Sequence, residues 1–539
     1  MNIILTAINA KYIHSSLAAY SLYAYLSDEE KQHVQIKEFT INQQESLIVS
    51  ELLRTKPDIL AFSCYIWNID LVLSIAETFK KVLPHIPIVL GGPEVSYEFE
   101  TDLADIIVRG EGEEAFKKIV QNAIEKNSVD SIFESTEIGA PLESIPFPYF
   151  TRFPDLANRI IYYETSRGCV NRCGFCLSSA TEGVRFLPLE RVQSDLAQFL
   201  AANVKQVKFV DRTFNCSKHH AMAIWQYLID HDNGITNFHF EIAGELIDDE
   251  MLAMLATARK GLFQFEIGVQ STNHKTLEAI RRTTDTALLF ENVRRLMSFG
   301  NIHLHLDLIV GLPYECYDTF QQSFNDVFAL RPHKLQIGFL KLLRGSRLRK
   351  DADKYGIVCK KNAPYSVLQT NFITFEQVNH IHKIEHMVET FYGGGGFHAA
   401  VRFMLANFTT PFNFFDKLAR HWEDGSYHLV SHKKMAMYSF LHSFGAAYLP
   451  DKLHQICEIL KFDMLLQENI RTFPTWIASY YTPDNRQMTR TAGVHTFAYD
   501  IAAWLEKEDT TPLTHQEISV EFDYTLPIEG GRCKPCTIS

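Results

Sequence analysis

Three cysteines in one short stretch carry the strongest chemical signal in the sequence. Cys169, Cys173 and Cys176 form a C-x3-C-x2-C run directly after the β-rich segment 159–165. A strand followed by this run brings three thiolates together on one loop, and thiolates are the usual ligands of iron–sulfur clusters. A structural zinc site needs four ligands, whereas a 4Fe–4S cluster on three cysteines leaves one iron open. We therefore predict a cluster with one iron available for chemistry.

Two other interpretations of the run stay open. A zinc knuckle would take its fourth ligand from His219 or His220, or the cysteines are adjacent by chance. The strand before the loop and the aromatic Phe175 before the last cysteine favour the cluster.

With Phe175 in that place, the run resembles the signature of the radical S-adenosylmethionine (SAM) superfamily. In that family the open iron binds the amino and carboxylate groups of SAM, and reductive cleavage yields a 5'-deoxyadenosyl radical. The resemblance implies an enzyme that uses a 4Fe–4S cluster, SAM and a reducing partner such as flavodoxin or ferredoxin.

Length and composition limit the architecture and the partners. A chain of 539 residues is too long for one ordinary core and suggests three domains. No apolar run approaches the roughly 20 residues that cross a bilayer, and Met1 precedes a strand pattern without a charged leader. Ten cysteines, three of them within eight residues, fit a reducing compartment. We expect a cytoplasmic protein with no membrane partner, and the net charge of −12 argues against DNA or RNA as a partner.

Residues 1–140 are predicted to form an α/β domain with a doubly wound, Rossmann-like parallel sheet. Continuous apolar runs alternate with helical patterns, which indicates parallel strands covered by helices on both faces. Ligands of such sheets bind beyond the carboxyl ends of the strands. Strands are expected at 3–8, 34–39, 59–64, 86–90 and 106–108, and helices at 15–26, 45–54, 69–83 and 113–125.

Two loops at these strand ends carry glycines where a ligand can approach the backbone, in PIVLGGPEVS and IIVRGEGEEAF. Taken alone, glycine after a parallel strand is usually turn chemistry. In this order ahead of the cysteine loop, the two motifs resemble the cobalamin-binding domain found in front of many radical-SAM enzymes. The resemblance implies cobalamin contacts at Gly91, Gly92, Gly110, Glu111 and Gly112.

The first loop departs from cobalamin domains that ligate cobalt through a histidine. Their motif is Asp-x-His-x-x-Gly, whereas Tyr12 replaces the aspartate and Leu17 the glycine around His14. We therefore expect the cobalt to have no histidine ligand from the protein. Tyr65 or Trp67, after the third strand, is expected at the lower face of the cobalt, with core packing as the alternative.

Residues 141–158 hold four prolines and are expected to form an extended linker.

Residues 159–375 then repeat six strand–helix units, as in the partial (βα)6 barrel of radical-SAM proteins, whose active end lies at the carboxyl ends of the strands. Strands are expected at 160–166, 206–211, 236–242, 262–269, 302–310 and 334–341, and helices at 189–202, 217–231, 248–258, 274–298 and 317–330.

Polar residues at these strand ends form the predicted SAM site. The resemblance places Asp211 and Thr213 at the methionyl amine and the main chain near Val310 at the adenine. Relatives often have an arginine on strand three, and its absence leaves the role of Glu241 open. A lone acid at a strand end is more often a helix cap or an ion-pair partner, but joint placement on successive strands favours a site. The predicted SAM contacts are Asp211, Thr213, Glu241, Glu266, Gln270, Ser271, Val310 and Gly311.

Residues 376–539 change to helical patterns rich in aromatic residues and histidines, and a mainly helical domain is expected. The run Gly393–Gly396 is expected to be a hinge or loop. Cys533 and Cys536 are expected on a flexible tail. The region resembles the uncharacterised C-terminal extension of one cobalamin-type radical-SAM subgroup, which implies a role in covering the barrel mouth and selecting the substrate.

Together the resemblances imply a cobalamin-dependent radical-SAM enzyme that methylates an unactivated carbon of an unknown substrate. A second interpretation keeps both cofactors for a rearrangement, cyclisation or reduction without methyl transfer. A third, of another class, is a non-catalytic cobalamin or iron–sulfur sensor. Methylthiolation of tRNA is set aside, because it normally needs three more cysteines in an N-terminal domain and only Cys64 precedes Cys169. The sequence specifies neither the substrate nor the oligomeric state.

Overall fold

The computed structural model describes residues 1–126, 139–149, 153–180, 183–470, 472–478, 492–507, 511–525 and 533–538. The chain divides into two units, each with its own core. The first contains Met1–Phe320, Leu330–Pro332 and Ile337–Phe375, and the second contains Gln321–Ala329, His333–Gln336 and Glu376–Ser539. Among the described residues, no helix combines the length and the apolar character that crossing a membrane requires.

The first unit begins with a parallel five-stranded sheet, in the order β2-β1-β3-β4-β5. This confirms the predicted doubly wound sheet, and the strand order places β1 and β3 next to each other at its centre. The strands are β1 (Ile3–Asn9), β2 (Val34–Thr40), β3 (Ile59–Ser63), β4 (Ile88–Gly91) and β5 (Ile106–Val108), and the helices are α1 (Leu17–Ala24), α2 (Asp28–Lys31), α3 (Glu45–Arg54), α4 (Ile69–Val82) and α5 (Glu113–Lys126).

Apolar side chains on both faces of the sheet explain why helices cover it twice. Ile4 and Leu60 point to one face and pack with Ile48 of α3 and with α4. Leu5 and Val89 point to the other face and pack with α1 and α5. All seven residues of β1 are buried, as expected for a parallel strand with a neighbour on each side.

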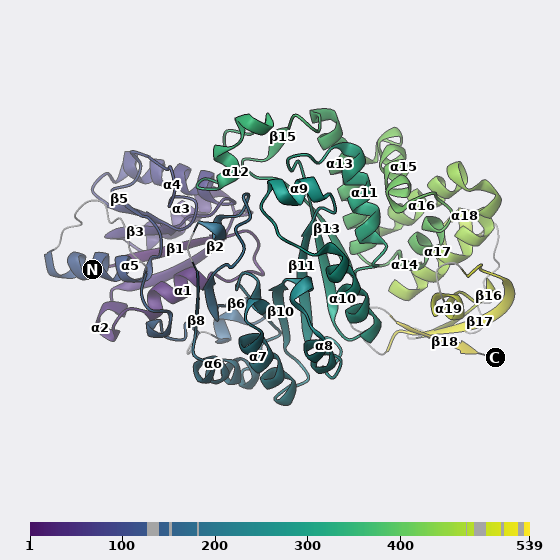
Figure 1. Ribbon diagram of the computed structural model, residues 1–539, viewed down its shortest axis with the longest axis horizontal. Helices are drawn as coiled ribbons and strands as arrows, with labels where there is room; N and C mark the ends of the chain where they lie inside the picture. Colours follow the sequence, from purple (N-terminus) through teal and green to yellow (C-terminus); the bar gives the residue numbers. More distant parts are fainter. Residues whose placement is uncertain are drawn as a thin grey trace. The chain divides into compact units, whose positions relative to one another are not determined.

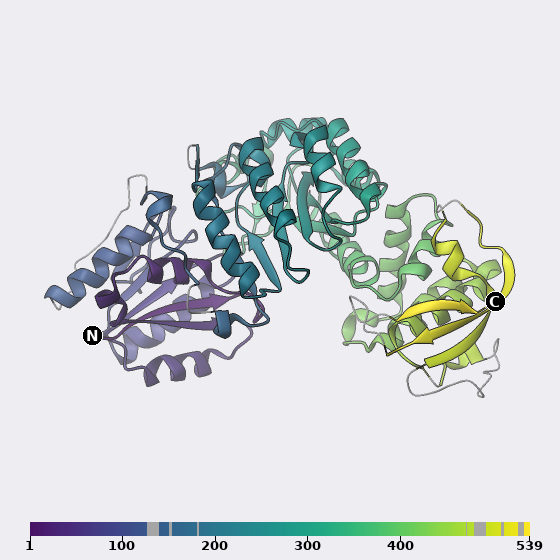
Figure 2. The same ribbon diagram turned by 90° about the horizontal axis from the view of Figure 1, so that it is seen from below.

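A second parallel sheet follows in the same unit, with its six strands in chain order, β6-β9-β10-β11-β12-β13. This is the predicted partial barrel, and helices lie along its outer face (Figures 1 and 2). The strands are β6 (Ile160–Tyr163), β9 (Gln206–Phe209), β10 (Asn237–Ile242), β11 (Phe263–Gln270), β12 (His303–Val310) and β13 (Lys334–Phe339), and the helices are α6 (Leu189–Ala201), α7 (Lys218–Asp230), α8 (Asp249–Leu255), α9 (His274–Ala279), α10 (Thr286–Phe299) and α11 (Tyr317–Phe328).

The helix predicted at 274–298 is wrong as a single element, because the chain breaks between α9 and α10. Arg281 adopts a φ of 57°, which a continuing helix does not allow. Asp285 then starts α10 as its N-cap, with its side chain accepting a hydrogen bond from Leu288 N.

Smaller elements complete the first unit. The hairpin of β7 and β8 brackets the cysteine loop, and its strands pair antiparallel from Ser166–Phe186 to Gly168–Val184. These elements are β7 (Ser166–Gly168), β8 (Val184–Phe186), α12 (Arg347–Lys350), β14 (Val358–Cys359) and β15 (Val367–Gln369). Residues 150–152 of the predicted linker lie outside the described residues.

The second unit is built on α17 (Leu453–Gln467), in which ten successive residues from Ile456 to Leu465 are buried. Its other helices are α13 (Phe375–Met387), a π-helix (Val388–Gly393), α14 (His398–Leu405), α15 (Pro411–Asp424), α16 (Lys434–Tyr448), α18 (Thr475–Ala478) and α19 (Ile501–Leu505). An antiparallel sheet follows in the order β16-β17-β18, with β16 (Ala492–Tyr499), β17 (His515–Asp523) and β18 (Lys534–Ile538), drawn in yellow in Figure 2.

The flexible tail expected at the C-terminus is wrong, because the tail forms β18. This strand pairs with β17 along its whole length. Cys533, just before it, is 5% exposed, and its backbone N–H donates to the carbonyl of Leu466 at 3.0 Å. The side chain of Cys536 lies outside the described part of the structure.

Candidate active site

A cavity of about 820 Å³ lies between the carboxyl ends of the first sheet and the mouth of the second. This volume is in the range typical of ligand sites. The first sheet contributes loop residues that include Asn9, Ser63, Tyr65, Gly91, Gly92, Gly110, Glu111 and Gly112. The second sheet contributes residues at or near its strand ends that include Tyr162, Glu164, Val210, Arg212 and Glu241, and the adjoining β7 contributes Arg167 and Gly168.

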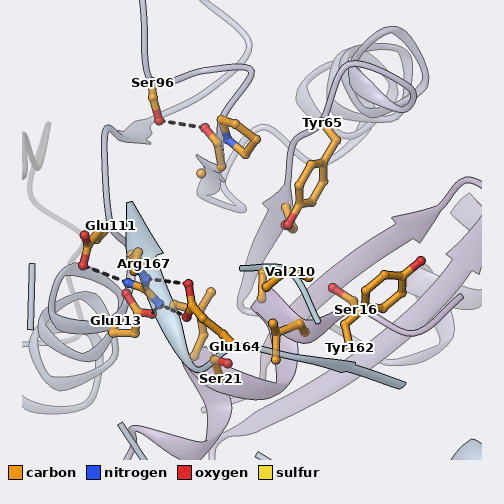
Figure 3. Close-up of a pocket in the computed structure, with 18 of the residues that line it drawn as sticks. Ser16, Ser21, Tyr65, Ser96, Glu111, Glu113, Tyr162, Glu164, Arg167 and Val210 are labelled. Carbon is orange, nitrogen blue, oxygen red and sulfur yellow. Dashed lines mark hydrogen bonds and ion pairs between the residues drawn. The ribbon is translucent and has the colours of Figure 1, made fainter. Parts of the chain in front are cut away.

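The glycine-rich loops form one wall of the cavity and are tied together by a single hydroxyl. Ser96 Oγ donates to the carbonyl of Gly92 at 2.8 Å and accepts a hydrogen bond from Gly110 N at 3.1 Å (Figure 3). Gly92 has a φ of 109°, and a Cβ there would lie 2.6 Å from the carbonyl oxygen of Cys64. The sequence predicted the glycines but not Ser96.

Tyr65 and Trp67 stack on each other in the loop after β3, with ring centroids 4.3 Å apart. The indole N–H of Trp67 donates to the carbonyl of Ile8 at 3.1 Å, which fixes the stack to the end of β1. Tyr65 projects from its loop into the cavity (Figure 3). Both residues line the cavity, and their place at the lower face of cobalt stays a prediction.

His14 also lines the cavity, but its ring is engaged. Its Nδ1 lies 2.7 Å from the hydroxyl of Tyr162 on β6. Burial lowers the pKa of His14, and the nearby charges of Lys11 and Lys208 lower it further, which favours the neutral imidazole.

Arg167 connects the two walls through a cluster of carboxylates. Its guanidinium contacts Glu111 and Glu113 of the first sheet at 2.8 Å each, and Glu164 at the end of β6 at 2.8 Å (Figure 3). Burial alone would lower the pKa of Arg167, but these carboxylates raise it above its ordinary value, so the arginine is a fixed cation. Glu111, predicted to contact cobalamin, is thus an ion-pair partner of Arg167 and of Arg185.

The cysteine loop begins where β7 ends at the cavity. Gly168 has a φ of 109°, and a Cβ there would lie 2.2 Å from the carbonyl oxygen of Gly183, so only glycine fits before Cys169. Cys173 is 5% exposed, and a guanidinium nitrogen of Arg282 lies 3.8 Å from its sulfur. Burial raises the pKa of Cys173, the Arg282 charge lowers it, and thiolates at Cys176 and Cys169 raise it.

The spread of the thiols favours a cluster over a zinc ion. A tetrahedral zinc ion holds its sulfur ligands about 3.8 Å apart. Among the described residues, the one group of three or more potential ligands whose donor atoms all lie within 4.8 Å of one another is Glu266, His305 and Asp307. The three thiols are therefore set wider than zinc requires. His220, one of the proposed fourth ligands, instead has its Nε2 3.2 Å from the hydroxyl of Thr165.

Asp211 holds the residues that precede the cysteine loop. It is fully buried, and its carboxylate accepts hydrogen bonds from Thr165 N and from the hydroxyls of Thr165 and Ser166. Burial raises its pKa to about 7, although these bonds favour the charged form. Direct contact of Asp211 with SAM stays a prediction.

Thr213 lies beside the first cysteine in a strained conformation. Its φ of 59° is a genuine outlier for a β-branched residue, and its hydroxyl lies 3.7 Å from Cys169 Sγ. Asn171 of the loop donates to the same hydroxyl at 3.1 Å. Strain of this kind is concentrated at functional sites.

The other predicted SAM residues lie on neighbouring strand ends. Glu241 pairs with Arg212, which follows the adjacent strand β9, and both line the cavity. Gln270 ends β11 with a φ of 70°, and its buried Oε1 has no hydrogen-bond partner among the described residues. Val310 is 1% exposed, and Gly311 after it has a φ of 89°.

Two other residues of the predicted set have protein partners of their own. Ser271 is fully buried and donates to Glu315, which the sequence analysis did not single out although it closes the motif DLIVGLPYE. Glu266 lies four residues before the end of β11 and contacts Lys208 and His239 inside the barrel.

Three family models match the chain in succession. The model described as "B12 binding domain" matches residues 3–120. The model described as "Radical SAM superfamily" matches residues 163–327. The model described as "Protein of unknown function (DUF4080)" matches residues 353–496.

Two curated relatives are methyltransferases. The chain is 24% identical over 350 residues to the cobalamin-dependent radical SAM methyltransferase TokK of Streptomyces tokunonensis, covering 56% of this chain and 50% of that protein. It is 28% identical over 339 residues to the 2-(S-pantetheinyl)-carbapenam-3-carboxylate methyltransferase of Streptantibioticus cattleyicolor, covering 52% and 46%. The chain thus spans about half the length of these relatives.

A solved structure shares the fold over most of the chain. The cobalamin-dependent S-adenosylmethionine radical enzyme OxsB superposes with a TM-score of 0.56, covering 86% of this chain and 78% of that chain. The sequence identity is 16%, so the likeness concerns the fold.

Proposed function

The chain is a cobalamin-binding radical SAM protein with a DUF4080 region, and from this premise we propose that it is a methyltransferase that acts on an unactivated carbon. The radical SAM domain implies a 4Fe–4S cluster and SAM, and the B12 binding domain implies cobalamin. The observation that carries the proposal is the cavity, which joins the glycine loops of the first sheet to the strand from which the cysteine loop starts.

The residues present fit these groups. Three thiols on one loop, set wider than zinc requires, suit the cluster, with Arg282 beside Cys173 to offset its negative charge. The side-chain-free wall of Gly91, Gly92, Gly110 and Gly112 leaves room for the flat face of a corrin ring. We assign SAM to the neighbouring strand ends, with Thr213, Glu241, Gln270 and the main chain at Val310 and Gly311 as its contacts.

When bound, these groups supply reductive cleavage of SAM and a methyl group for transfer. The protein then has to orient them and keep water out. Arg167 would help to orient them, because it holds Glu111 and Glu113 of one cavity wall to Glu164 of the other. The stacked rings of Tyr65 and Trp67 would exclude water from their side of the cavity. Neither role requires a side chain that acts as acid or base.

Substrate choice is assigned to the DUF4080 region, which is the part that the two other matches leave uncovered. The cluster needs an electron donor, for which a flavodoxin or ferredoxin is suited. Free thiols and an oxygen-sensitive cluster fit a reducing compartment such as the cytoplasm.

Anaerobic reconstitution with iron, sulfide and hydroxocobalamin tests the proposal. We expect about four irons and one cobalamin per chain, and reduction should convert SAM to 5'-deoxyadenosine and S-adenosylhomocysteine. Cys173→Ala should lose the cluster and SAM cleavage but keep cobalamin, because the glycine wall is separate from the thiols.

Cys316→Ser is the matched control, since this cysteine lies outside the loop and should leave the cluster intact. Deoxyadenosine without S-adenosylhomocysteine would replace methyl transfer by another radical reaction. Reduced protein that binds both cofactors and never cleaves SAM would overturn the enzyme assignment in favour of a sensor.

A further inference from the structure

The inside of the barrel carries a group of charged side chains that the proposed function leaves unused. Lys208 and His239 are register partners on β9 and β10, and Glu266 and His305 are register partners on β11 and β12. Asp307 lies two residues beyond His305, on the same side of its strand. The sheet therefore directs all five side chains to one point.

The donor atoms come close together. Oε2 of Glu266 lies 3.1 Å from Nε2 of His239 and 3.9 Å from Nδ1 of His305. Nε2 of His305 lies 2.9 Å from Oδ1 of Asp307. One donor atom each from Glu266, His305 and Asp307 fits within 4.8 Å of the others.

These short distances do not correspond to hydrogen bonds. Nε2 of His239, Nε2 of His305 and Oδ1 of Asp307 are all buried and have no hydrogen-bond partner among the described residues. The two histidines are 6% and 5% exposed, so solvent does not satisfy them. Buried polar atoms without partners are costly, and a cation shared by these atoms would satisfy them together.

We propose that His239, Glu266, His305 and Asp307 bind one divalent first-row transition-metal ion inside the barrel, separate from the cysteine loop. Imidazole and carboxylate are the ligands that zinc, iron(II) and manganese(II) share. Glu266 then serves this ion rather than SAM.

Lys208 is the competitor for this site. Its ammonium lies 2.9 Å from the same Oε2 of Glu266 and also lines the cavity. It neutralises Glu266 when the ion is absent and has to swing toward the cavity when the ion binds. Removal of Lys208 should therefore strengthen metal binding, whereas removal of a lysine from an ordinary ion pair would not create a metal site.

Titration of the full-length chain with Co²⁺ tests the proposal, in a background where Cys169, Cys173 and Cys176 are replaced by serine so that the cluster loop cannot bind metal. We expect one Co²⁺ per chain, with a visible and EPR spectrum typical of nitrogen and oxygen ligands. His239→Gln and His305→Gln should each weaken binding at least tenfold, since even outer partners of metal ligands contribute about 10–100-fold. Lys208→Met should tighten it several-fold.

His303→Gln is the control, because His303 is exposed on the same strand and should leave the affinity unchanged. Absence of Co²⁺ binding, a spectrum with thiolate charge transfer, or an affinity unchanged in both histidine variants would overturn the site. If the histidine variants fail to fold, Lys208→Met decides, and an unchanged affinity there would equally refute the proposal.

Discussion

Gly92 shows how one residue type can define a cavity wall. Its backbone has a φ of 109°, and any Cβ would meet the carbonyl of Cys64 at 2.6 Å. Neither strain is present at Gly91, where the nearest neighbour of an added Cβ is Val108 Cβ at an ordinary 3.6 Å. The two adjacent glycines therefore have different tolerances, although the sequence presents them as equivalent.

We expect Gly92→Ala to lose cobalamin binding and Gly91→Ala to retain much more of it. The positive φ costs an alanine about 1–3 kcal/mol, and relief of the clash has to move the loop that forms the cavity wall. Cobalamin per chain after desalting, read from the visible spectrum, measures the effect. The iron content should stay the same in both variants. Equal cobalamin in the two variants would mean that this loop does not form the cobalamin wall.

At the residue scale, the sequence predicted residues whose type is constrained by the local backbone. It missed residues whose role depends on a hydrogen-bond or ion-pair partner elsewhere in the chain. Cysteine spacing and paired glycines are local signals. Ser96 joins loops whose glycines are eighteen positions apart, at Gly92 and Gly110, and nothing in its neighbours announces that role. Arg212 was missed for the same reason, because its partner Glu241 lies on the next strand.

Among the elements, the C-terminal sheet departs most from expectation. β16 alternates buried and partly exposed residues, but β18 is short, contains Pro535 and becomes a strand only through its pairing with β17. Single-sequence patterns favour elements with their own periodicity, as in the five strands of the first sheet and the helices α1, α3, α4 and α5. The break at Arg281 was also missed, because the residues on both sides of it follow a helical pattern.

Truncation after Thr525 should destabilise the second unit, because it removes β18 and exposes the β17 edge and the carbonyl of Leu466 that Cys533 satisfies. We expect its unfolding midpoint to fall by about 5 °C or more, followed by circular dichroism during heating. Deletion of Ser539 alone is the control and should leave the midpoint unchanged. A truncated chain as stable as the control would show that β18 adds nothing to this unit.

Among the described residues of the first unit, the ion pairs that link the first sheet to the following part of the chain have one polarity. The glutamates belong to the first sheet and its loops, and the arginines come from later in the chain. The pairs are Glu38 with Arg159, Glu94 with Arg344, and Glu111 with Arg167 and Arg185. These pairs are largely buried, so dissolved salt weakens them less than it weakens exposed pairs, and removal of one partner leaves a poorly solvated charge behind.

Arg159→Met should test this interface. Its partner Glu38 is 10% exposed in its side chain and would lose its cation, at a cost of about 2 kcal/mol, below the 3–5 kcal/mol of a fully buried pair. We expect a lower unfolding midpoint and faster proteolysis near residues 139–158. Arg54→Met, which breaks the exposed pair with Glu51, should cost less than about 0.5 kcal/mol. Similar effects of both substitutions would contradict a special role for the inter-sheet pairs.

The residues that line the cavity extend along the chain from Leu5 to Glu241, and this spacing has a consequence for biosynthesis. The first sheet is complete once Val108 has left the ribosome, yet at that moment its strand ends form an uncovered shelf. Only after β10 has emerged does the opposite side exist. A corrinoid would therefore meet an open binding surface early in translation, and it would be enclosed only after β10 has been synthesised.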